Sequence, residues 1–365
     1  MHNKEQVSSL QIAFMVMLFE IGSTPLFLLG GKAKQDSWLA MCVGSLAGLL
    51  LLLLLLWIQE HSLGLDLIGI LRFNFGATAG SVVGWIYCLY FAYESMRNVR
   101  DLGELTSLTL LQTTPMSITM LVFVLIALYA IWKGTAVLFR LPEVLLPMLL
   151  FFYGLLVLLL GIMGSIDFRR LTPVFEGGLR PILDAALPEI VSFPFGQMLV
   201  FLMLWSLWEK PGVPVKNTIS AYIAISIFLI FMNALNVAVL GPTVAGISQL
   251  PFLKTVRTLS NLQFVERLDI LVTIQLFVGL LIKMMIFYFC AVKGISGLTG
   301  KPLKWWVFPV GAVIYGTSFV ERDYTQHIAI GLGPSLKIDP VFQIAVPLLL
   351  AVSILLRSRF KRTPS

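Results

Sequence analysis

Ten apolar stretches fill almost the whole sequence, and each is near the ~20 residues that a helix needs to cross the hydrocarbon core of a bilayer. Their expected bounds are 8–30, 37–58, 79–104, 116–132, 141–164, 183–208, 217–240, 264–292, 303–320 and 339–357. With 58% hydrophobic and only 12% charged residues, and a mean hydropathy of +0.91, the chain cannot hide its apolar side chains in a water-soluble core. We therefore expect an all-α, polytopic membrane protein that forms one transmembrane domain over residues 1–365, with no soluble domain.

Two of these stretches are interrupted in the same way, at Glu20–Pro25 and at Ser192–Gln197. An unpaired backbone group is costly in lipid, so a helix broken at membrane depth persists only where it is buried or lines a polar cavity. In transporters, matching breaks in the two halves of an inverted repeat form the binding pocket, and half-helix N-termini face the anionic part of the ligand. The breaks lie about half a chain apart. This spacing predicts a five-plus-five repeat, with a first repeat at about 8–164 and a second at about 183–357.

We predict that the ligand pocket is built from the residues of these two breaks. Glycines there supply backbone freedom, hydroxyl and amide groups supply hydrogen bonds, and Phe193 or Phe195 supplies an apolar wall. The predicted ligand-binding residues are Glu20, Gly22, Ser23, Thr24, Ser192, Phe193, Gly196 and Gln197.

Ionisable residues inside the apolar stretches are a second signal, because each costs at least ~2.5 kcal/mol at the bilayer centre unless it is paired or hydrated. Glu20 directly precedes the first break, where freed amides and water can serve it; the alternative is that it only packs. Lys283 lies well inside the eighth stretch. It either occupies a cation site or contacts a ligand carboxylate, or it snorkels to water.

Glu94 follows Tyr87 and Tyr90 at helical spacing, so one helix face presents aromatic rings and a carboxylate together. We list Tyr90, Glu94 and Lys283 as possible ligand or ion contacts. The alternative for Glu94 is a structural pair with nearby Arg97. Glu143, beside Pro142, is expected to be a first-turn charge at a helix start, favoured by the helix dipole.

No arrangement of residues indicates catalysis, a metal or a cofactor. The three histidines are scattered, no nucleophile stands beside an activating partner, and no phosphate-binding glycine loop is present. The three cysteines fall within apolar stretches without metal or redox spacing, and we expect buried, unpaired thiols. The net charge of +7 comes from Lys and Arg in short connections, which argues against a nucleic-acid partner.

The connections between stretches predict the topology. Residues 61–78 suit a short interfacial helix, or else an ordinary polar loop. The longer connections 167–182 and 241–263 are separated by an even number of stretches, so they fall on one side and can cover the site. The bias of Lys and Arg among the short loops predicts that both termini are cytoplasmic.

Several segments also carry a family resemblance. They are Leu250–Arg257 leading to Phe264–Asp269, which reads F-x-E-R-x-[DE], together with Arg140–Glu143, Leu171–Ile182 and Ser192–Gln197. In these segments, and in length and order of stretches, the chain resembles the spore germination permeases, the B subunits of bacterial nutrient germinant receptors. The resemblance implies the amino acid–polyamine–organocation superfamily and a LeuT-like fold with helices one and six broken. It also implies the spore inner membrane, an A subunit and a C-subunit lipoprotein as partners, and a small nutrient such as an amino acid as ligand.

Two departures from the family bear on the ligand. Members commonly carry a glutamate where this chain has Gln197, and the glycine-rich first break is reduced to Gly22. Two functional classes then stay open: a sensor whose ligand shifts an open–closed equilibrium, and a secondary transporter of amino acids or amines. The paired breaks disfavour a structural subunit without a ligand.

Overall fold

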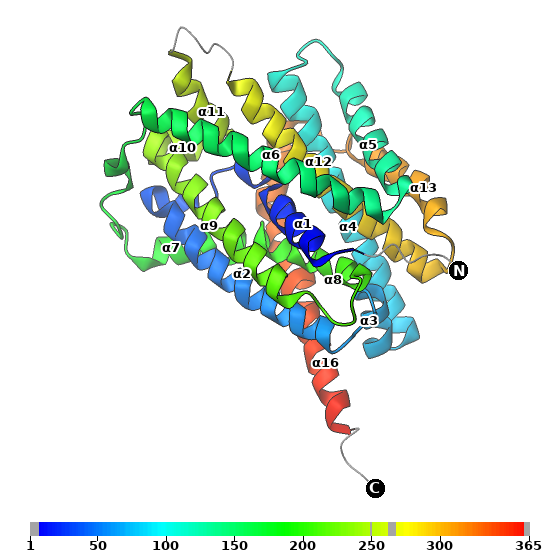
Figure 1. Ribbon diagram of the computed structural model, residues 1–365. Helices are drawn as coiled ribbons and strands as arrows, with labels where there is room; N and C mark the ends of the chain where they lie inside the picture. The colour runs from blue at the N-terminus through cyan, green and yellow to red at the C-terminus, as the bar shows by residue number, and fades with distance from the viewer. Residues whose placement is uncertain (1–6, 249, 262–267, 361–365) are drawn as a thin grey trace.

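The computed structural model describes residues 7–248, 250–261 and 268–360, and this part of the chain is helical without a β-strand (Figure 1). Eight of its helical segments are long and apolar enough to cross a membrane. They are Ser9–Leu26, Gly31–Glu60, Met116–Lys133, Thr135–Ile162, Leu179–Leu207, Val215–Leu240, Asp269–Thr299 and Tyr324–Arg357. The expectation of an all-α, polytopic membrane protein is therefore confirmed.

The α-helices have the following bounds: α1 (Ser9–Ile21), α2 (Ser37–Glu60), α3 (Leu67–Phe75), α4 (Ala77–Thr109), α5 (Met116–Lys133), α6 (Thr135–Ile162), α7 (Leu179–Ala185), α8 (Phe201–Leu204), α9 (Val215–Leu240), α10 (Pro242–Ile247), α11 (Pro251–Arg257), α12 (Asp269–Thr299), α13 (Leu303–Thr317), α14 (Tyr324–Ile330), α15 (Leu336–Pro340) and α16 (Val346–Phe360). Short 3-10 turns are η1 (Thr24–Leu26), η2 (Gly31–Asp36), η3 (Phe168–Leu171), η5 (Phe195–Val200), η6 (Trp205–Leu207) and η7 (Thr258–Asn261). Single π-turns are η4 (Ala186–Ile190), η8 (Gly331–Ser335) and η9 (Val341–Ala345).

Two of the ten predicted spans coincide with helices that are not among these eight membrane-crossing segments. The first is α4, whose 33 residues include several charged side chains, and the second is α13, whose 15 residues are fewer than a bilayer core requires. Ten membrane crossings and the inverted repeat stay predictions.

Both predicted breaks interrupt regular helix. The first helix ends at Ile21, the backbone of Gly22 has a positive φ of 24°, and a single 3-10 turn follows at η1. In the second break, a turn at Phe193 and Pro194 separates the helix that leads up to it from the 3-10 turn η5. A positive φ is costly for any residue with a Cβ, so the first break specifically requires a glycine.

The last helix begins earlier than predicted. It runs from Tyr324 to Phe360 through two π-turns, η8 and η9, whereas the apolar pattern predicted 339–357. Its first half contains Pro334, Lys337 and Pro340, and these residues interrupt the apolar pattern from which membrane spans are predicted. Single π-turns inside helices are frequent at functional sites.

The prediction for Glu143 was wrong. Helix α6 starts at Thr135, directly after Gly134, so Glu143 lies well inside the helix rather than in its first turn. The error came from taking Pro142 as a helix start. A transmembrane helix tolerates internal prolines when its neighbours satisfy the freed backbone groups, and α6 contains two, Pro142 and Pro147.

The segment 61–78 does contain a short helix, α3. Asp66 caps it by accepting a 3.1 Å hydrogen bond from the amide of Gly69, and its apolar side chains Leu67, Ile68 and Leu71 are buried. Its interfacial position stays a prediction.

Hydrogen bonds and an ion pair hold the connections between helices together at the two ends of the bundle. Val7 exchanges 3.1 Å hydrogen bonds with Leu207 and Glu209, and Lys293 pairs with Asp66 at 3.4 Å, so these segments share one end of the bundle. At the other end, the connection after α6 hydrogen-bonds to Ala238 of α9 and to the Asp36 carboxylate of η2. The α11 part of the 241–263 connection packs on η1, and its Thr255 donates a 2.9 Å hydrogen bond to Asn236. Of the F-x-E-R motif, residues 264–267 lie outside the described residues.

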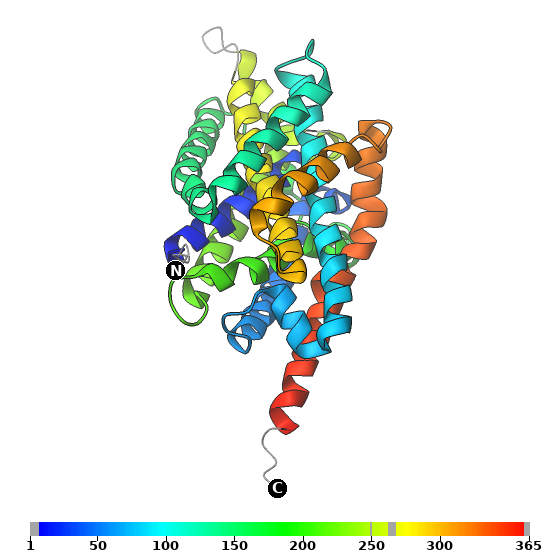
Figure 2. The same ribbon diagram turned by 90° about the vertical axis from the view of Figure 1, so that its right-hand side faces the viewer.

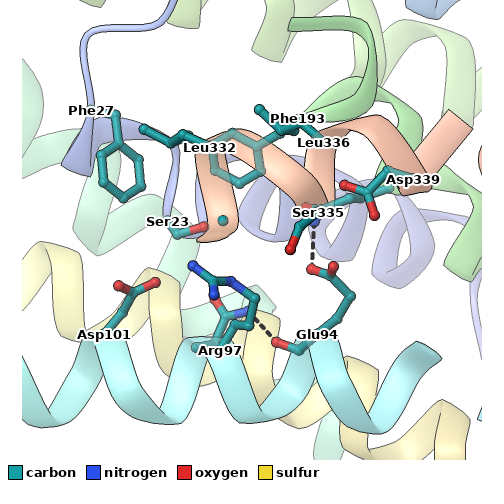
Figure 3. Close-up of a pocket in the computed structure, with 13 residues that line it drawn as sticks. Ser23, Phe27, Glu94, Arg97, Asp101, Phe193, Leu332, Ser335, Leu336 and Asp339 are labelled. Carbon is teal, nitrogen blue, oxygen red and sulfur yellow. Dashed lines mark hydrogen bonds between the residues drawn. The ribbon is translucent and has the colours of Figure 1, made fainter. Parts of the chain in front are cut away.

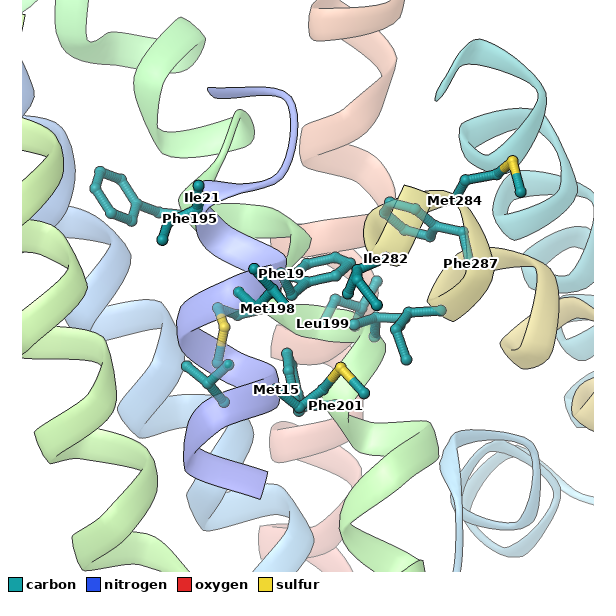
Figure 4. Close-up of a cluster of buried hydrophobic side chains, with 14 of the residues drawn as sticks. Met15, Phe19, Ile21, Phe195, Met198, Leu199, Phe201, Ile282, Met284 and Phe287 are labelled. Carbon is teal, nitrogen blue, oxygen red and sulfur yellow. The ribbon is translucent and has the colours of Figure 1, made fainter. Parts of the chain in front are cut away.

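The first break is held by a core that joins α1, the second break and α12 (Figure 4). The Phe19 ring packs edge-on against Phe201, with 5.7 Å between ring centroids, and at a tilt against Phe287, with 5.3 Å between ring centroids. A Cβ on Gly279 of α12 would lie 2.5 Å from the carbonyl oxygen of Gly22. The two backbones therefore touch, and only a glycine fits at 279.

We expect Gly279→Ala to destabilise the protein by about 1–3 kcal/mol, the usual cost of overpacking, because the added methyl meets backbone rather than a mobile side chain. The matched control is Gly297→Ala in the same helix, where nothing lies within 4 Å, so that better helix propensity stabilises slightly. Thermal unfolding in detergent measures both. Equal midpoints for the two variants would contradict the proposed contact.

Candidate ligand site at the helix breaks

A cavity of about 60 Å³ lies where the two breaks meet α4 and the last helix (Figure 3). Each of these elements contributes part of the wall. The lining residues are Ser23, Phe193 and Gln197 from the breaks, Phe27 just after the first break, Glu94, Arg97, Asn98 and Asp101 from α4, and Gly331, Leu332, Ser335, Leu336 and Asp339 from the last helix. The α4 side of the cavity is entirely polar or charged, whereas the breaks and the last helix contribute both polar and apolar side chains.

Four of the predicted site residues line this cavity: Ser23, Phe193, Gln197 and Glu94. Glu94 and Gln197 are joined directly, because the Gln197 amide donates a 2.8 Å hydrogen bond to the Glu94 carboxylate. The structural pair considered between Glu94 and Arg97 does not form. Arg97 instead binds Glu321, with 3.1 Å between nitrogen and oxygen.

The predicted glycines do not line the cavity but allow its walls to approach. A Cβ on Gly22 would lie 2.6 Å from the Lys283 side chain, and one on Gly196 would lie 2.1 Å from the Gln343 side-chain oxygen. The lack of a side chain at Gly22 thus allows α12 to pack closely, and the lack of one at Gly196 allows the last helix to do so. This steric role differs from the predicted backbone freedom, which only the positive φ of Gly22 requires.

Thr24, Ser192 and Tyr90 were also predicted site residues, but they do not line this cavity. The Thr24 hydroxyl donates a 2.7 Å hydrogen bond to the Glu20 carbonyl, and Thr24 lines a separate cavity of about 20 Å³. Ser192 is fully buried. The Tyr90 hydroxyl accepts a 2.9 Å hydrogen bond from Gln343, and its ring stacks on Phe342 at 4.4 Å, so it anchors the last helix to α4.

Glu20 and Lys283 are both fully buried beside the first break. The Lys283 ammonium lies 4.6 Å from the centre of the Phe193 ring and 5.2 Å from that of Phe19, both within cation–π range. Lys283 therefore does not snorkel to water. Within the described part of the chain, neither its ammonium nor the Glu20 carboxylate has a hydrogen-bond partner, but the two charges are close enough to interact.

Sequence reasoning missed an ionic network beside the cavity, which ties α4 to the last helix. Asp101 of α4 accepts from His327 at 3.2 Å, and the other ring nitrogen of His327 contacts Glu321. Arg97 also donates to the His327 carbonyl at 2.8 Å. Glu321 and His327 are 6 residues apart, but the α4 residues that bind them, Arg97 and Asp101, are more than 200 residues away, so no local pattern reveals the network.

The lining residues of the last helix were also missed, although a signal existed. Gly331, Ser335 and Asp339 recur every four residues, which places them on one helix face. The predicted span began only at 339, so this spacing was never read as part of a helix.

Glu321 lies in the connection between α13 and α14. Burial alone would raise the pKa of its carboxyl group, but the hydrogen bond and charge of His327, with the charges of Arg97 and Arg100, hold the pKa below its ordinary value of 4.5. A carboxylate with a lowered pKa stabilises the fold above its unfolded-state pKa, and this contribution is lost as the pH falls through the folded-state pKa.

We expect the wild-type protein in detergent to lose thermal stability as the pH falls below about 4.5, in part through protonation of Glu321. Glu321→Gln should be less stable at neutral pH and show a shallower acid loss. The exposed Glu60, at the end of α2, provides the control Glu60→Gln, which should follow the wild type. Parallel acid profiles for Glu321→Gln and wild type would contradict this role.

Comparison with known proteins agrees with this architecture. The family model described as spore germination protein matches residues 6–326. Spore germination protein KB of Bacillus subtilis is 28% identical over 354 residues, covering 96% of this chain and 94% of that protein, and spore germination protein B2 is 23% identical over 275 residues, covering 73% of each.

Among solved structures, the chain matches Mhp1, a nucleobase-cation-symport-1 family transporter in a closed conformation with bromovinylhydantoin bound. The TM-score is 0.68 at 13% identity, covering 92% of this chain and 78% of that one. This match shows a LeuT-like transporter fold. Because the family model spans most of the sequence, the chain belongs to the spore germination protein family.

Proposed function

We propose that this chain is the nutrient-sensing membrane subunit of a spore germinant receptor, and that a small nutrient, an amino acid, binds at the cavity between the two breaks. The observation that carries the proposal is the convergence of both broken helices with α4 and the last helix on one buried polar cavity. Irregular backbone at membrane depth is tolerated where it serves such a cavity.

A ligand in this cavity would act on the contacts that close it. Arg97 lies against Gly331, where a Cβ would be 2.0 Å from the guanidinium, and its bonds to Glu321 and His327 hold α4 and the last helix together. Entry of a nutrient larger than the cavity separates these elements. For the nutrient to shift the open–closed equilibrium, it must bind one of the two states more tightly.

The output of such a shift would pass to other proteins. The membrane helices and their short connections account for the described residues, so the proposed receivers are the A subunit and the C-subunit lipoprotein, in the spore inner membrane with both termini on the core side. The second candidate function is secondary transport of amino acids or amines. The specific observation in its favour is the fold shared with Mhp1.

Reconstitution separates the two functions. We expect proteoliposomes that contain only this chain to show no ion-coupled uptake of labelled amino acids, and pull-down from spore membranes to recover A and C subunits. Deleting the A subunit should abolish germination by the cognate nutrient while ligand binding to this chain persists. Robust ion-coupled uptake without a recovered partner would instead establish the transporter.

The charged residues beside the first break give another test. Glu20→Gln should impair the germination response more than Glu143→Gln, because Glu20 is fully buried near Lys283, whereas Glu143 is half-buried on α6. Removing one member of a buried charge pair leaves the other uncompensated. Lys283→Met should therefore impair the response, and the double variant Glu20→Gln/Lys283→Met should be less impaired than the sum of the single variants. Equal, small losses for Glu20→Gln and Glu143→Gln would assign Glu20 to packing.

A further inference from the structure

The charges that line the cavity are mostly negative. Three carboxylates, Glu94, Asp101 and Asp339, face one guanidinium, Arg97. Glu94 and Asp339 approach the cavity from two different elements, α4 and the last helix, and their charges act on each other (Figure 3). Two buried carboxylates at one site repel unless a cation or a proton lies between them.

Part of this charge is already matched inside the protein. The Arg97 guanidinium is bound to Glu321 and to the His327 carbonyl, and Asp101 is bound by His327 and by the Tyr324 hydroxyl at 3.2 Å. These contacts belong to the network at one end of the cavity. Glu94 accepts a hydrogen bond from Gln197, and Asp339 accepts one from the Tyr90 hydroxyl, but neither carboxylate forms an ion pair among the described residues, so these two remain to meet a ligand cation.

A third acceptor stands beside them. Gln197 uses its amide nitrogen to bind Glu94, while its side-chain oxygen is buried and has no donor among the described residues. Gln197 is 4% exposed and lines the cavity. A buried acceptor without a donor carries an uncompensated desolvation cost, so a ligand that donates to it removes that cost.

We propose that the ligand is held by a primary ammonium group between Glu94, Asp339 and the side-chain oxygen of Gln197. An ammonium offers three N–H donors and one positive charge, which match the three acceptors and their net negative charge. Phe27, Phe193, Leu332 and Leu336 line the same cavity and suit the apolar part of an organic amine, which a bare alkali cation lacks. The inference rests on the proposed ligand site but not on the receptor role.

The first experiment compares ligand pools on the purified wild-type chain in detergent, with the thermal unfolding midpoint as readout. Pools of amino acids, amino acid amides and Nα-acetyl amino acids, each without lysine, carry the same side chains, but only the first two keep the α-ammonium. We expect the first two pools to raise the midpoint and the N-acetyl pool to leave it unchanged. An equal shift with the N-acetyl pool, or shifts only with glucose, inosine or potassium chloride, would overturn the proposal.

The second experiment uses isosteric variants. With the active member of the amide pool as probe, Glu94→Gln and Asp339→Asn should each raise Kd about tenfold or more, as loss of a charge-assisted hydrogen bond predicts. The control is Asp184→Asn on α7, whose carboxylate is 68% exposed and which should bind as wild type does. Unchanged affinity in both cavity variants would overturn the assignment.

These outcomes are separable from the sensing function. Amine binding without any effect of the same amine on germination would keep the ammonium site and remove the sensor. Germination triggered through this chain by a neutral sugar would keep the sensor and remove the ammonium site.

Discussion

The contact between α12 and the first helix break is the constraint on which the rest of the site depends. Gly279 brings the α12 backbone against the carbonyl of Gly22, and Lys283, one turn further along, lies across the same glycine. The rings of Phe19, Phe201 and Phe287 close around this contact and fix the second break beside the first. With both breaks held in this way, Ser23, Phe193 and Gln197 face one cavity.

Buried charged side chains are the second organising element. Some of them form ion pairs, and others have no hydrogen-bond partner among the described residues. In the network of Arg97, Asp101, Glu321 and His327, each charge has a partner at hydrogen-bonding distance, which limits the desolvation penalty and joins distant segments. Beside the cavity, Glu20 and Lys283 are fully buried without a hydrogen-bond partner among the described residues. Groups held at such cost near a cavity are typical of functional sites in membrane proteins.

Features that depend on a few neighbouring residues were predictable from the sequence. The interruptions at Gly22 and at Pro194 follow from the backbone chemistry of glycine and proline. Glu94 could be identified as a candidate site residue because a carboxylate is costly in an apolar stretch. The contribution of the last helix was not predictable in the same way, since polar residues and prolines masked its first half. A pair of Arg97 with Glu94 was one of two alternatives that the sequence left open, but the fold brings Glu321 to Arg97 from 224 residues away. Long-range pairing of this kind depends on helix packing, which local sequence patterns do not reveal.

The last helix lines the cavity with Gly331 to Asp339 and then continues beyond the body of the bundle, where α16 projects at its lower end (Figures 1 and 2). At 1.5 Å per residue, the stretch from Asp339 to Arg357 spans roughly 27 Å. Mechanically it is a lever arm, with its short end against the cavity and with Ser353 and Arg357 resting on α3. A tilt of about 10° about Asp339 would displace Arg357 by about 5 Å at that rise per residue. The same tilt would move Gly331, eight residues from Asp339 on the cavity side, by only about 2 Å, so the far end of the helix would move farther than the cavity end.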